Sequence, residues 1–127
     1  MKEIIRTSKA PEAIGAYSQA VKVGDFLFAS GQIPIDPQTG NLIEGGIEAQ
    51  TKQVMENVKH VLQAGGSDLD NVIKTTIYIL KMEDFSVVNQ VYGTYFTKNL
   101  PARSCVAVAS LPKEALVEIE VVGYCRQ

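Results

Sequence analysis

Residues 71–81 read NVIKTTIYILK, and this stretch decides the fold because its period of two lies between two segments with a helical period. One set of side chains alternates with Lys74, Thr76 and Tyr78, and it is rich in the β-branched residues that favour strands. That alternating set comprises Ile73, Thr75, Ile77 and Ile79. We therefore predict a strand here, with a helix on either side of it in the sequence.

Both flanking segments carry helical spacing. In residues 47–64 apolar or small side chains recur every three or four positions, and Gly65 and Gly66 follow as a typical helix stop. In residues 83–98 a second apolar stripe follows acidic residues, which the positive end of a helix dipole favours. The stripes are Thr51, Val54, Val58, Val61 and Leu62 in the first segment, and Phe85, Val88, Tyr92, Tyr95 and Phe96 in the second. Each segment is predicted to be a helix.

The remaining segments supply further strands. Gly24 and Asp25 suit the tight turn of a β-hairpin over residues 18–30, and the Gly- and Pro-rich residues 31–46 are expected to form an ordered loop. Two more strands are predicted from the segments RSCVAVAS and LVEIEVVGYC. The order strand, hairpin, helix, strand, helix, strand, strand predicts one α+β domain over residues 1–127. We expect about six strands in a mixed or antiparallel sheet, with two helices on one face.

The second face of this sheet has no predicted cover. On the strand that starts at Arg103, one side carries Ser104, Val106 and Val108. The other side carries Arg103, Cys105 and two alanines, so neither side is typical of a solvated face. Because a large exposed apolar surface usually marks an interface, we predict a homo-oligomer that packs sheet against sheet.

The composition and net charge of the chain limit the classes of partner that it is expected to bind. The chain has 127 residues, of which 46% are hydrophobic and 20% are charged, as in an ordinary globular protein. Its net charge is −2 and its Lys and Arg residues are scattered, so we predict no nucleic-acid partner. Its apolar runs are far shorter than the ~20 residues of a membrane span. The start, MKEIIRTSKAP, has charges on both sides of only two isoleucines, far short of the apolar core of a signal peptide. We expect a cytoplasmic protein without a membrane partner, in which Cys105 and Cys125 are free thiols.

Several reaction classes need residue patterns that this sequence lacks. Its single histidine, His60, lies in the middle of the first predicted helix, which disfavours both a Ser-His-Asp triad and a histidine-based metal site. Phosphate-binding and dinucleotide-binding glycine motifs are also missing. We therefore expect no metal, and chemistry carried by Arg, Glu, Tyr, Ser, Asn and Cys.

Arg103 and Glu118 have the most informative positions among the charged residues. Arg103 begins an apolar strand on the same face as Cys105, and Glu118 shares one face of the last strand with Glu120. In one interpretation these charges are solvated or paired at the rim of the sheet, and Cys105 is a small core residue. In the other, Arg103 binds a ligand carboxylate through two parallel charge-assisted hydrogen bonds.

The segment PARSCVAVASL at residues 101–111, with VEI at residues 117–119, resembles the signature of the RidA (YjgF) family of reactive intermediate deaminases. AIGAYSQA at 13–20, FASGQIPIDPQTG at 28–40, NVIKTTIYI at 71–79 and the segment 85–89 also resemble family blocks, so the resemblance covers essentially the whole chain. It implies a chorismate-mutase-like fold. It also implies a homotrimer with a central barrel and with ligand sites in the clefts between subunits.

The resemblance further implies hydrolysis of 2-imino acids or their enamine tautomers, without a cofactor. Substrates of this class are 2-aminoacrylate, its tautomer 2-iminopropanoate, and 2-iminobutanoate, and the products are 2-oxo acids and ammonia. Pyridoxal-phosphate enzymes form such intermediates from serine or threonine, so a functional link to those enzymes is expected. An imine is already electrophilic, so positioning and acid–base catalysis suffice for its hydrolysis.

Site residues carry over by their positions in the motifs. Arg103 is expected to bind the substrate carboxylate, and Glu118 is expected to position and activate the attacking water. Ser30 and Gly31 are expected to border the imine end with a hydroxyl and a backbone N–H. The remaining expected pocket residues are Tyr17, Asn89 and Cys105.

Two positions complete this comparison. Glu120 is left as a structural residue, because the VEI match selects Glu118. Ala16 replaces a proline that the family often has before the tyrosine, which is expected to loosen the loop of Tyr17.

Two other functions stay open beside the hydrolase. A site made of recognition groups without a strong nucleophile also suits a regulatory protein that binds 2-oxo acids without catalysis. Some family members are labelled RNA-cleaving translation inhibitors, but the acidic charge and the single histidine of this chain count against that function.

Overall fold

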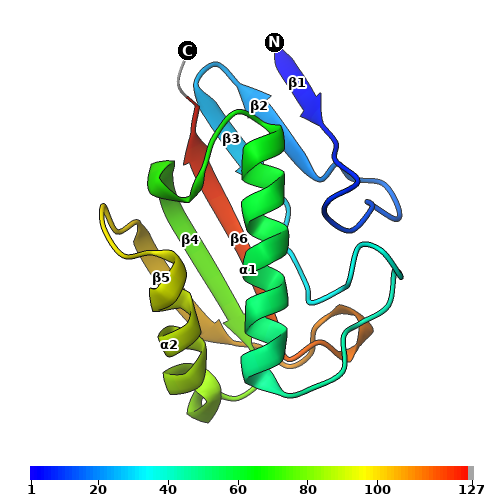
Figure 1. Cartoon of the computed structure of the whole chain (residues 1–127), viewed down its shortest axis with the longest axis vertical. Helices are drawn as coiled ribbons and strands as arrows, with labels where there is room; N and C mark the ends of the chain where they lie inside the picture. The colour runs from blue at the N-terminus through cyan, green and yellow to red at the C-terminus, as the bar shows by residue number, and fades with distance from the viewer. Residues whose placement is uncertain (126–127) are drawn as a thin grey trace.

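Six strands within residues 1–125, the part of the chain that the computed structural model describes, form one mixed sheet with both helices on one face (Figure 1). The strands are β1 (Lys2–Ile5), β2 (Ala20–Val23), β3 (Phe26–Ala29), β4 (Val72–Ile79), β5 (Ala102–Ala107) and β6 (Val117–Tyr124); the helices are α1 (Ile47–Ala64) and α2 (Phe85–Tyr95). Their order in space is β1-β2-β3-β6-β4-β5. Only β4 and β5 run parallel to each other; the other neighbouring pairs are antiparallel. The predicted α+β class and mixed sheet are confirmed.

Strand β4 follows the predicted alternation except at its start. Thr75, Ile77 and Ile79 are buried beneath the helices, as predicted. Ile73, predicted to point the same way, is instead 43% exposed. The pairing with β6 shifts register between Val72 and Lys74, and this bulge turns Val72 inward in place of Ile73.

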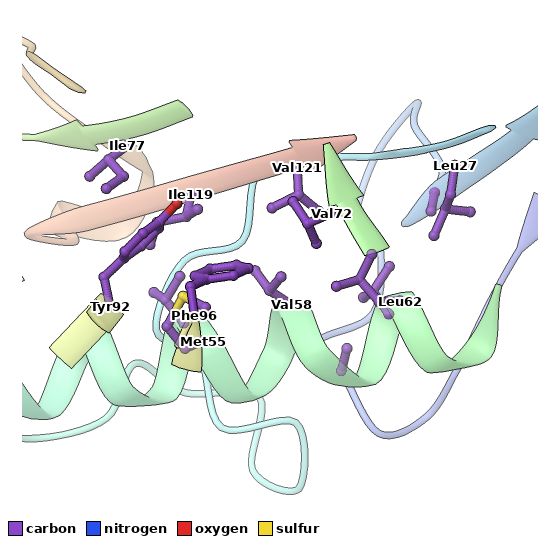
Figure 2. Packing of buried hydrophobic residues seen from close by; sticks show 14 of the residues in the cluster. Leu27, Met55, Val58, Leu62, Val72, Ile77, Tyr92, Phe96, Ile119 and Val121 are labelled. Atoms are coloured by element: carbon purple, nitrogen blue, oxygen red, sulfur yellow. The ribbon is translucent and has the colours of Figure 1, made fainter. Parts of the chain in front are cut away.

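The core lies between the sheet and α1, with α2 closing its side (Figure 2). Side chains of α1 meet the inward residues of β4 and β6, while Tyr92 and Phe96 approach from α2 with their ring centroids 4.6 Å apart. Residues with no exposed surface at the centre of this core are Leu27, Met55, Val58, Leu62, Ile77 and Ile119. This packing fixes β6, the strand that carries Glu118.

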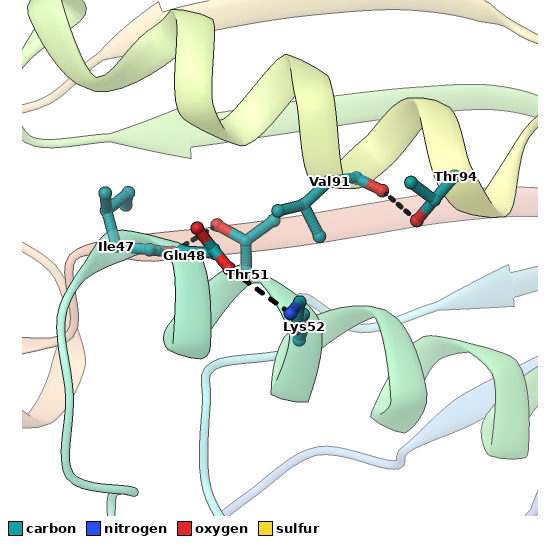
Figure 3. Close-up of polar contacts among 6 residues, drawn as sticks. All are labelled: Ile47, Glu48, Thr51, Lys52, Val91 and Thr94. Atoms are coloured by element: carbon teal, nitrogen blue, oxygen red, sulfur yellow. Dashed lines mark hydrogen bonds and ion pairs between the residues drawn. The ribbon is translucent and has the colours of Figure 1, made fainter.

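The helices are bounded by local backbone signals. After α1, Gly65 N–H donates to two carbonyl groups of the last turn, and Gly66 has a left-handed φ of +86°, as expected of a helix stop. Helix α2 is shorter than predicted, because a 3₁₀ turn (Met82–Asp84) precedes it. Figure 3 shows hydroxyl groups that bond to the backbone within each helix, from Thr51 to Ile47 O and from Thr94 to Val91 O.

The hairpin and the later strands are also slightly shorter than predicted. Gly24 has a left-handed φ of +58° in the predicted turn between β2 and β3. Strand β5 ends at Ala107, and Val108 N–H makes one further bond to Ile79 O at 2.8 Å. Beyond it the chain turns through a 3₁₀ segment (Pro112–Glu114) into β6.

The face of the sheet opposite the helices, called the open face below, carries exposed apolar side chains. Strand pairing places Val23, Phe26 and Tyr124 side by side across β2, β3 and β6. Each of the following residues is between 39% and 52% exposed. They are Ile4, Val23, Phe26, Phe28, Val106 and Tyr124. The predicted uncovered face therefore exists in the single chain. Among the described helices, none has the length and apolar character needed to cross a bilayer.

Candidate functional site

Glu118 lines a cavity of about 580 Å³. Glu118 lies on β6 between Val117 and Ile119, both buried under the helices, so its side chain points to the open-face side. Gln32 N–H donates to Ile119 O at 2.9 Å, and Ile119 N–H donates to Gln32 O at 3.1 Å. These two bonds hold the segment after β3 alongside β6. Members of the cavity lining include Ile14, Tyr17, Ser30, Gly31, Lys113 and Glu118.

The surroundings of Glu118 favour its protonated form. Burial raises the pKa of this half-buried carboxyl group, and the charge of Glu120 raises it further. Glu120 accepts a hydrogen bond from Tyr78 OH at 3.3 Å. A carboxylate with a raised pKa is a stronger base, which suits a group that takes a proton from water and returns it.

Ser30 and Gly31 offer two different groups to the cavity. Ser30 Oγ donates its proton to Ser18 O at 2.6 Å, so only its lone pairs are available to a ligand. Gly31 N–H makes no hydrogen bond to any residue in the described part of the chain. The cavity therefore presents a hydroxyl acceptor and a backbone donor on adjacent residues.

Tyr17 lies on an exposed loop at the rim of the same cavity. Its ring is 54% exposed, and its hydroxyl accepts a hydrogen bond from Ile14 N–H at 3.4 Å. The phenol proton is therefore available to a ligand. Gly15, with a φ of +118°, allows the sharp turn that brings Tyr17 N–H to Gly15 O.

The side chain of Gln19 anchors the start of this loop. Its Oε1 accepts from Thr7 N–H at 2.7 Å, and its Nε2 donates to Thr7 O, Ala10 O and Pro11 O at 3.0, 3.3 and 2.7 Å. Gln19 is 4% exposed, so these bonds satisfy a buried amide. Its backbone oxygen also accepts from Ser30 N–H at 2.9 Å, which joins the loop to the floor of the cavity.

Arg103 belongs to a second site, on the helix side of the sheet. Its Nη1 donates to Asn89 Oδ1 at 2.6 Å, and its guanidinium carbon lies 5.2 Å from the ring centroid of Phe85 and 5.0 Å from that of Tyr92. Such cation–π contacts hold a guanidinium in place without using its N–H donors. A neighbouring hollow of about 440 Å³ is lined by Asn89, Tyr92, Gly93, Phe96, Leu100 and Arg103.

Cys105 lies on the same side of β5 as Arg103 and is half-buried against the core. Burial raises the pKa of its thiol, and the positive charge of Arg103 opposes that shift only in part. The structure thus brings the predicted site residues into two groups. Tyr17, Ser30 and Gly31 surround Glu118, whereas Asn89 contacts Arg103 and Cys105 lies next along its strand.

The two groups face opposite sides of the sheet within one chain. Arg103 pairs in register with Thr75, whose side chain is buried and hydrogen-bonded to Tyr92 OH at 2.8 Å beneath α2. Glu118 lies across β4 and points the other way. One chain therefore does not bring Arg103 and Glu118 to the same face of the sheet.

Sequence reasoning did not single out three residues of these sites. Phe85 and Tyr92 were given no role at a site, although their spacing with Asn89 (i, i+4, i+7) indicates one helix face that could hold a cation. Lys113 lines the Glu118 cavity in a turn where its φ is 56°, a left-handed value that is uncommon outside glycine. No sequence pattern pointed to Lys113.

Residues 1–125 contain no cluster of three His, Cys, Asp or Glu side chains placed to hold a metal ion.

Comparisons with known proteins agree over nearly the whole chain. A RutC family protein of Pyrococcus horikoshii is 53% identical over 98% of both chains. The 2-iminobutanoate/2-iminopropanoate deaminase of Rattus norvegicus is 48% identical over 97% of this chain and 90% of its own. The crystal structure of E. coli TdcF with bound serine superposes with a TM-score of 0.92 at 42% identity, covering 98% of this chain and 99% of TdcF. The family described as Endoribonuclease L-PSP matches residues 7–125, and the chain therefore belongs to this family, the YjgF/RidA family that its sequence resembles.

Proposed function

We propose that this protein hydrolyses reactive 2-imino acids and their enamine tautomers to 2-oxo acids and ammonia, without a cofactor. Its substrates would be 2-aminoacrylate, 2-iminopropanoate and 2-iminobutanoate, supplied by pyridoxal-phosphate enzymes in the cytoplasm. The observation that carries the proposal is the Glu118 carboxyl group, with its raised pKa, in a cavity beside a free backbone N–H and a hydroxyl acceptor. The deaminase name of the rat relative supports it.

The complete site is proposed to form between subunits of a homotrimer whose sheets surround a central barrel. Arg103 and Glu118 face opposite sides of one sheet, so one chain would supply Arg103 and its neighbour would supply Glu118. The apolar residues of the open face support such an assembly, because association would remove them from water. The substrate would then lie in the cleft where the two chains meet.

In this mechanism the guanidinium of Arg103 binds the substrate carboxylate through its free N–H donors. A water held by Glu118 adds to the imine carbon, and Glu118 takes one of its protons as the C–O bond forms. Glu118 returns that proton to the nitrogen, which gives a carbinolamine. It then takes the proton of the new hydroxyl group and passes it to the nitrogen, so that the C–N bond breaks, ammonia leaves and the 2-oxo acid forms. Ser30 Oγ accepts a bond from the substrate N–H, while Gly31 N–H and Tyr17 OH are donors to the reacting oxygen.

The test generates 2-iminobutanoate in situ and follows its decay with and without the protein. Arg103→Ala and Glu118→Gln are each expected to abolish the acceleration while the oligomer stays intact by light scattering. Arg6→Ala, which removes an exposed arginine elsewhere, is the matched control. Full activity of the Arg103→Ala protein would remove the carboxylate-binding role.

A mixture of the two inactive variants tests whether the site lies between subunits. When the variants are unfolded together and refolded at equal amounts, about a quarter of the sites should combine an intact Arg103 with an intact Glu118. Activity should therefore return to roughly that fraction of the wild-type value. A mixture that stays inactive would contradict a shared site.

Assays of the wild-type protein distinguish imine hydrolysis from the two alternative functions, regulatory binding of 2-oxo acids and RNA cleavage. Tight binding of 2-oxobutanoate with no effect on imine decay would select a regulatory protein. The Endoribonuclease L-PSP description of the family makes RNA a necessary control. RNA cleavage, with binding that weakens steeply as salt rises, would select a nuclease.

A further inference from the structure

Ile33 and Ile35 form one wall of the Glu118 cavity, on a segment without helix or strand. Ile35 is 7% exposed and forms an isolated bridge with Leu42, and Ile43 N–H donates to Pro34 O at 3.0 Å. These contacts fold the segment onto itself, and the two backbone bonds between Gln32 and Ile119 hold its start to β6. Beyond Gln32 the wall needs a further attachment to set its distance from Glu118.

Asn57 supplies that attachment from the buried face of α1. It has no exposed surface, and its Nδ2 donates to Ile33 O at 3.2 Å and to Ile35 O at 3.0 Å. Its Oδ1 accepts from Gln53 Nε2 at 2.9 Å, which fixes the orientation of the amide. Asn57 therefore uses both amide hydrogens on two carbonyl groups of the wall, and it does not line the cavity itself.

The choice of asparagine at this place has a physical cost. It is a poorer helix former than leucine, and burying an amide is unfavourable unless all its bonds are made. A leucine of similar size would improve the core but would leave the two carbonyl groups without these donors. The position therefore serves the wall of the cavity more than it serves the helix.

We propose that Asn57 is a positioning residue, which fixes the Ile33 and Ile35 wall so that substrate and water meet Glu118 in a reactive arrangement. This inference rests on the proposed hydrolase function. Asn57 contacts neither substrate nor Glu118, and it acts through the backbone of the wall. Misplacement of reacting groups by about 1 Å can lower a rate by about 100-fold, so a loosened wall has a measurable effect.

Asn57→Ala tests the proposal with two readouts, imine hydrolysis and amide hydrogen exchange. We expect kcat/KM for 2-iminobutanoate to fall about 10-fold or more, measured well below the melting temperature so that the variant stays folded. Amide exchange should accelerate more than in β4 at two N–H groups: that of Gln32, just before the wall, and that of Ile43, which bonds to Pro34 O within it. Asn57→Ser, which keeps one donor, is expected to lose less activity and replaces the alanine variant if that one fails to fold.

Ser67→Ala is the matched control. It also removes a buried side-chain hydrogen bond, from Ser67 Oγ to Tyr124 O at 2.7 Å, at a place outside the cavity lining. It should lower the melting temperature and leave kcat/KM unchanged. Asn57 variants with wild-type kcat/KM would overturn the positioning role alone. A wild-type protein without effect on the imine would overturn the proposed function as well, so the two failures are distinct.

Discussion

The carboxyl group of Glu118 occupies the space where a side chain at position 31 would begin. A β-carbon built on Gly31 would lie 2.7 Å from Glu118 Cδ and would overlap the carboxylate oxygen. Gly31 is therefore required for its lack of a side chain, which lets the backbone approach the Glu118 carboxyl group closely.

Gly31→Ala is expected to displace Glu118 and to lower kcat/KM for 2-iminobutanoate by about 100-fold, since a shift of about 1 Å can have that effect. Gly46→Ala is the control, because a β-carbon there meets nothing within 4 Å and φ is an ordinary −90°. Circular dichroism should show both variants folded. Equal activity of the two would show that the position of the Glu118 carboxyl group does not limit the reaction.

The pH dependence of kcat/KM should report Glu118. Activity requires the ionised carboxylate, so it should fall toward acid with a midpoint above 4.5, the usual value, because burial and the charge of Glu120 raise the pKa. Glu120→Gln removes that charge and should move the midpoint to lower pH. Tyr78→Phe removes the bond to Glu120 but keeps the charge, so its midpoint should stay above that of Glu120→Gln.

Stability should also depend on Glu118, with a sign opposite to that of a paired carboxylate. The folded state binds the Glu118 proton more tightly than the unfolded chain, so this contribution to stability is present below pH 4.5 and is lost as pH rises through the folded pKa. A glutamine does not titrate, so the Glu118→Gln variant does not lose stability at this position as pH rises. Urea unfolding at fixed protein concentration should therefore show the variant gaining on wild type between acid and neutral pH. A constant difference across that range would contradict the raised pKa.

Two substitutions at Tyr92 separate its roles. Tyr92→Phe removes the hydrogen bond to Thr75 and leaves a buried hydroxyl unpaired, which should cost about 1–2 kcal/mol of unfolding free energy. The ring remains beside Arg103, so KM should be unchanged. Tyr92→Leu also removes the cation–π contact, worth about 0.5–2 kcal/mol, and should raise KM several-fold. Identical KM values for the two variants would rule out a role for the ring in holding Arg103.

Gln19→Leu should release the loop that carries Tyr17. The substitution leaves the carbonyl groups of Thr7, Ala10 and Pro11 without their donor, at a cost of about 2 kcal/mol. Trypsin should then cleave faster at Lys9, which precedes one of the released carbonyl groups, and KM should rise. Unchanged cleavage at Lys9 would show that other contacts hold the loop.

The fold was predictable because its signals are local, whereas the site depends on register. Alternation in residues 71–81 and the helical stripes gave the α+β class, but the bulge that exposes Ile73 depends on pairing with β6, which no local pattern encodes. Alternation likewise placed Arg103 with Cys105 and Glu118 with Glu120. It could not show that the two pairs face opposite sides, because that relation is set by the register in which β5 and β6 pair with β4.

The residues that position the site were harder to predict from the sequence than the fold. Asn57 and Gln19 act through backbone carbonyl groups far away in the sequence, and carbonyl groups are the same in every residue. Each is a polar residue among other polar residues of its segment, so the sequence identifies neither the segment that it holds nor the purpose of that contact. Such roles emerge only from coordinates.

In the proposed mechanism, the opposite orientations of Arg103 and Glu118 make activity depend on assembly of the chains and on protein concentration. A chain just released from the ribosome would be inert, and rotation of either side chain could not repair this, because β4 stands between them. Turnover would begin only when copies meet, so very dilute protein would lose activity faster than in proportion to its concentration. Imine hydrolysis would then begin only above a threshold level of expression.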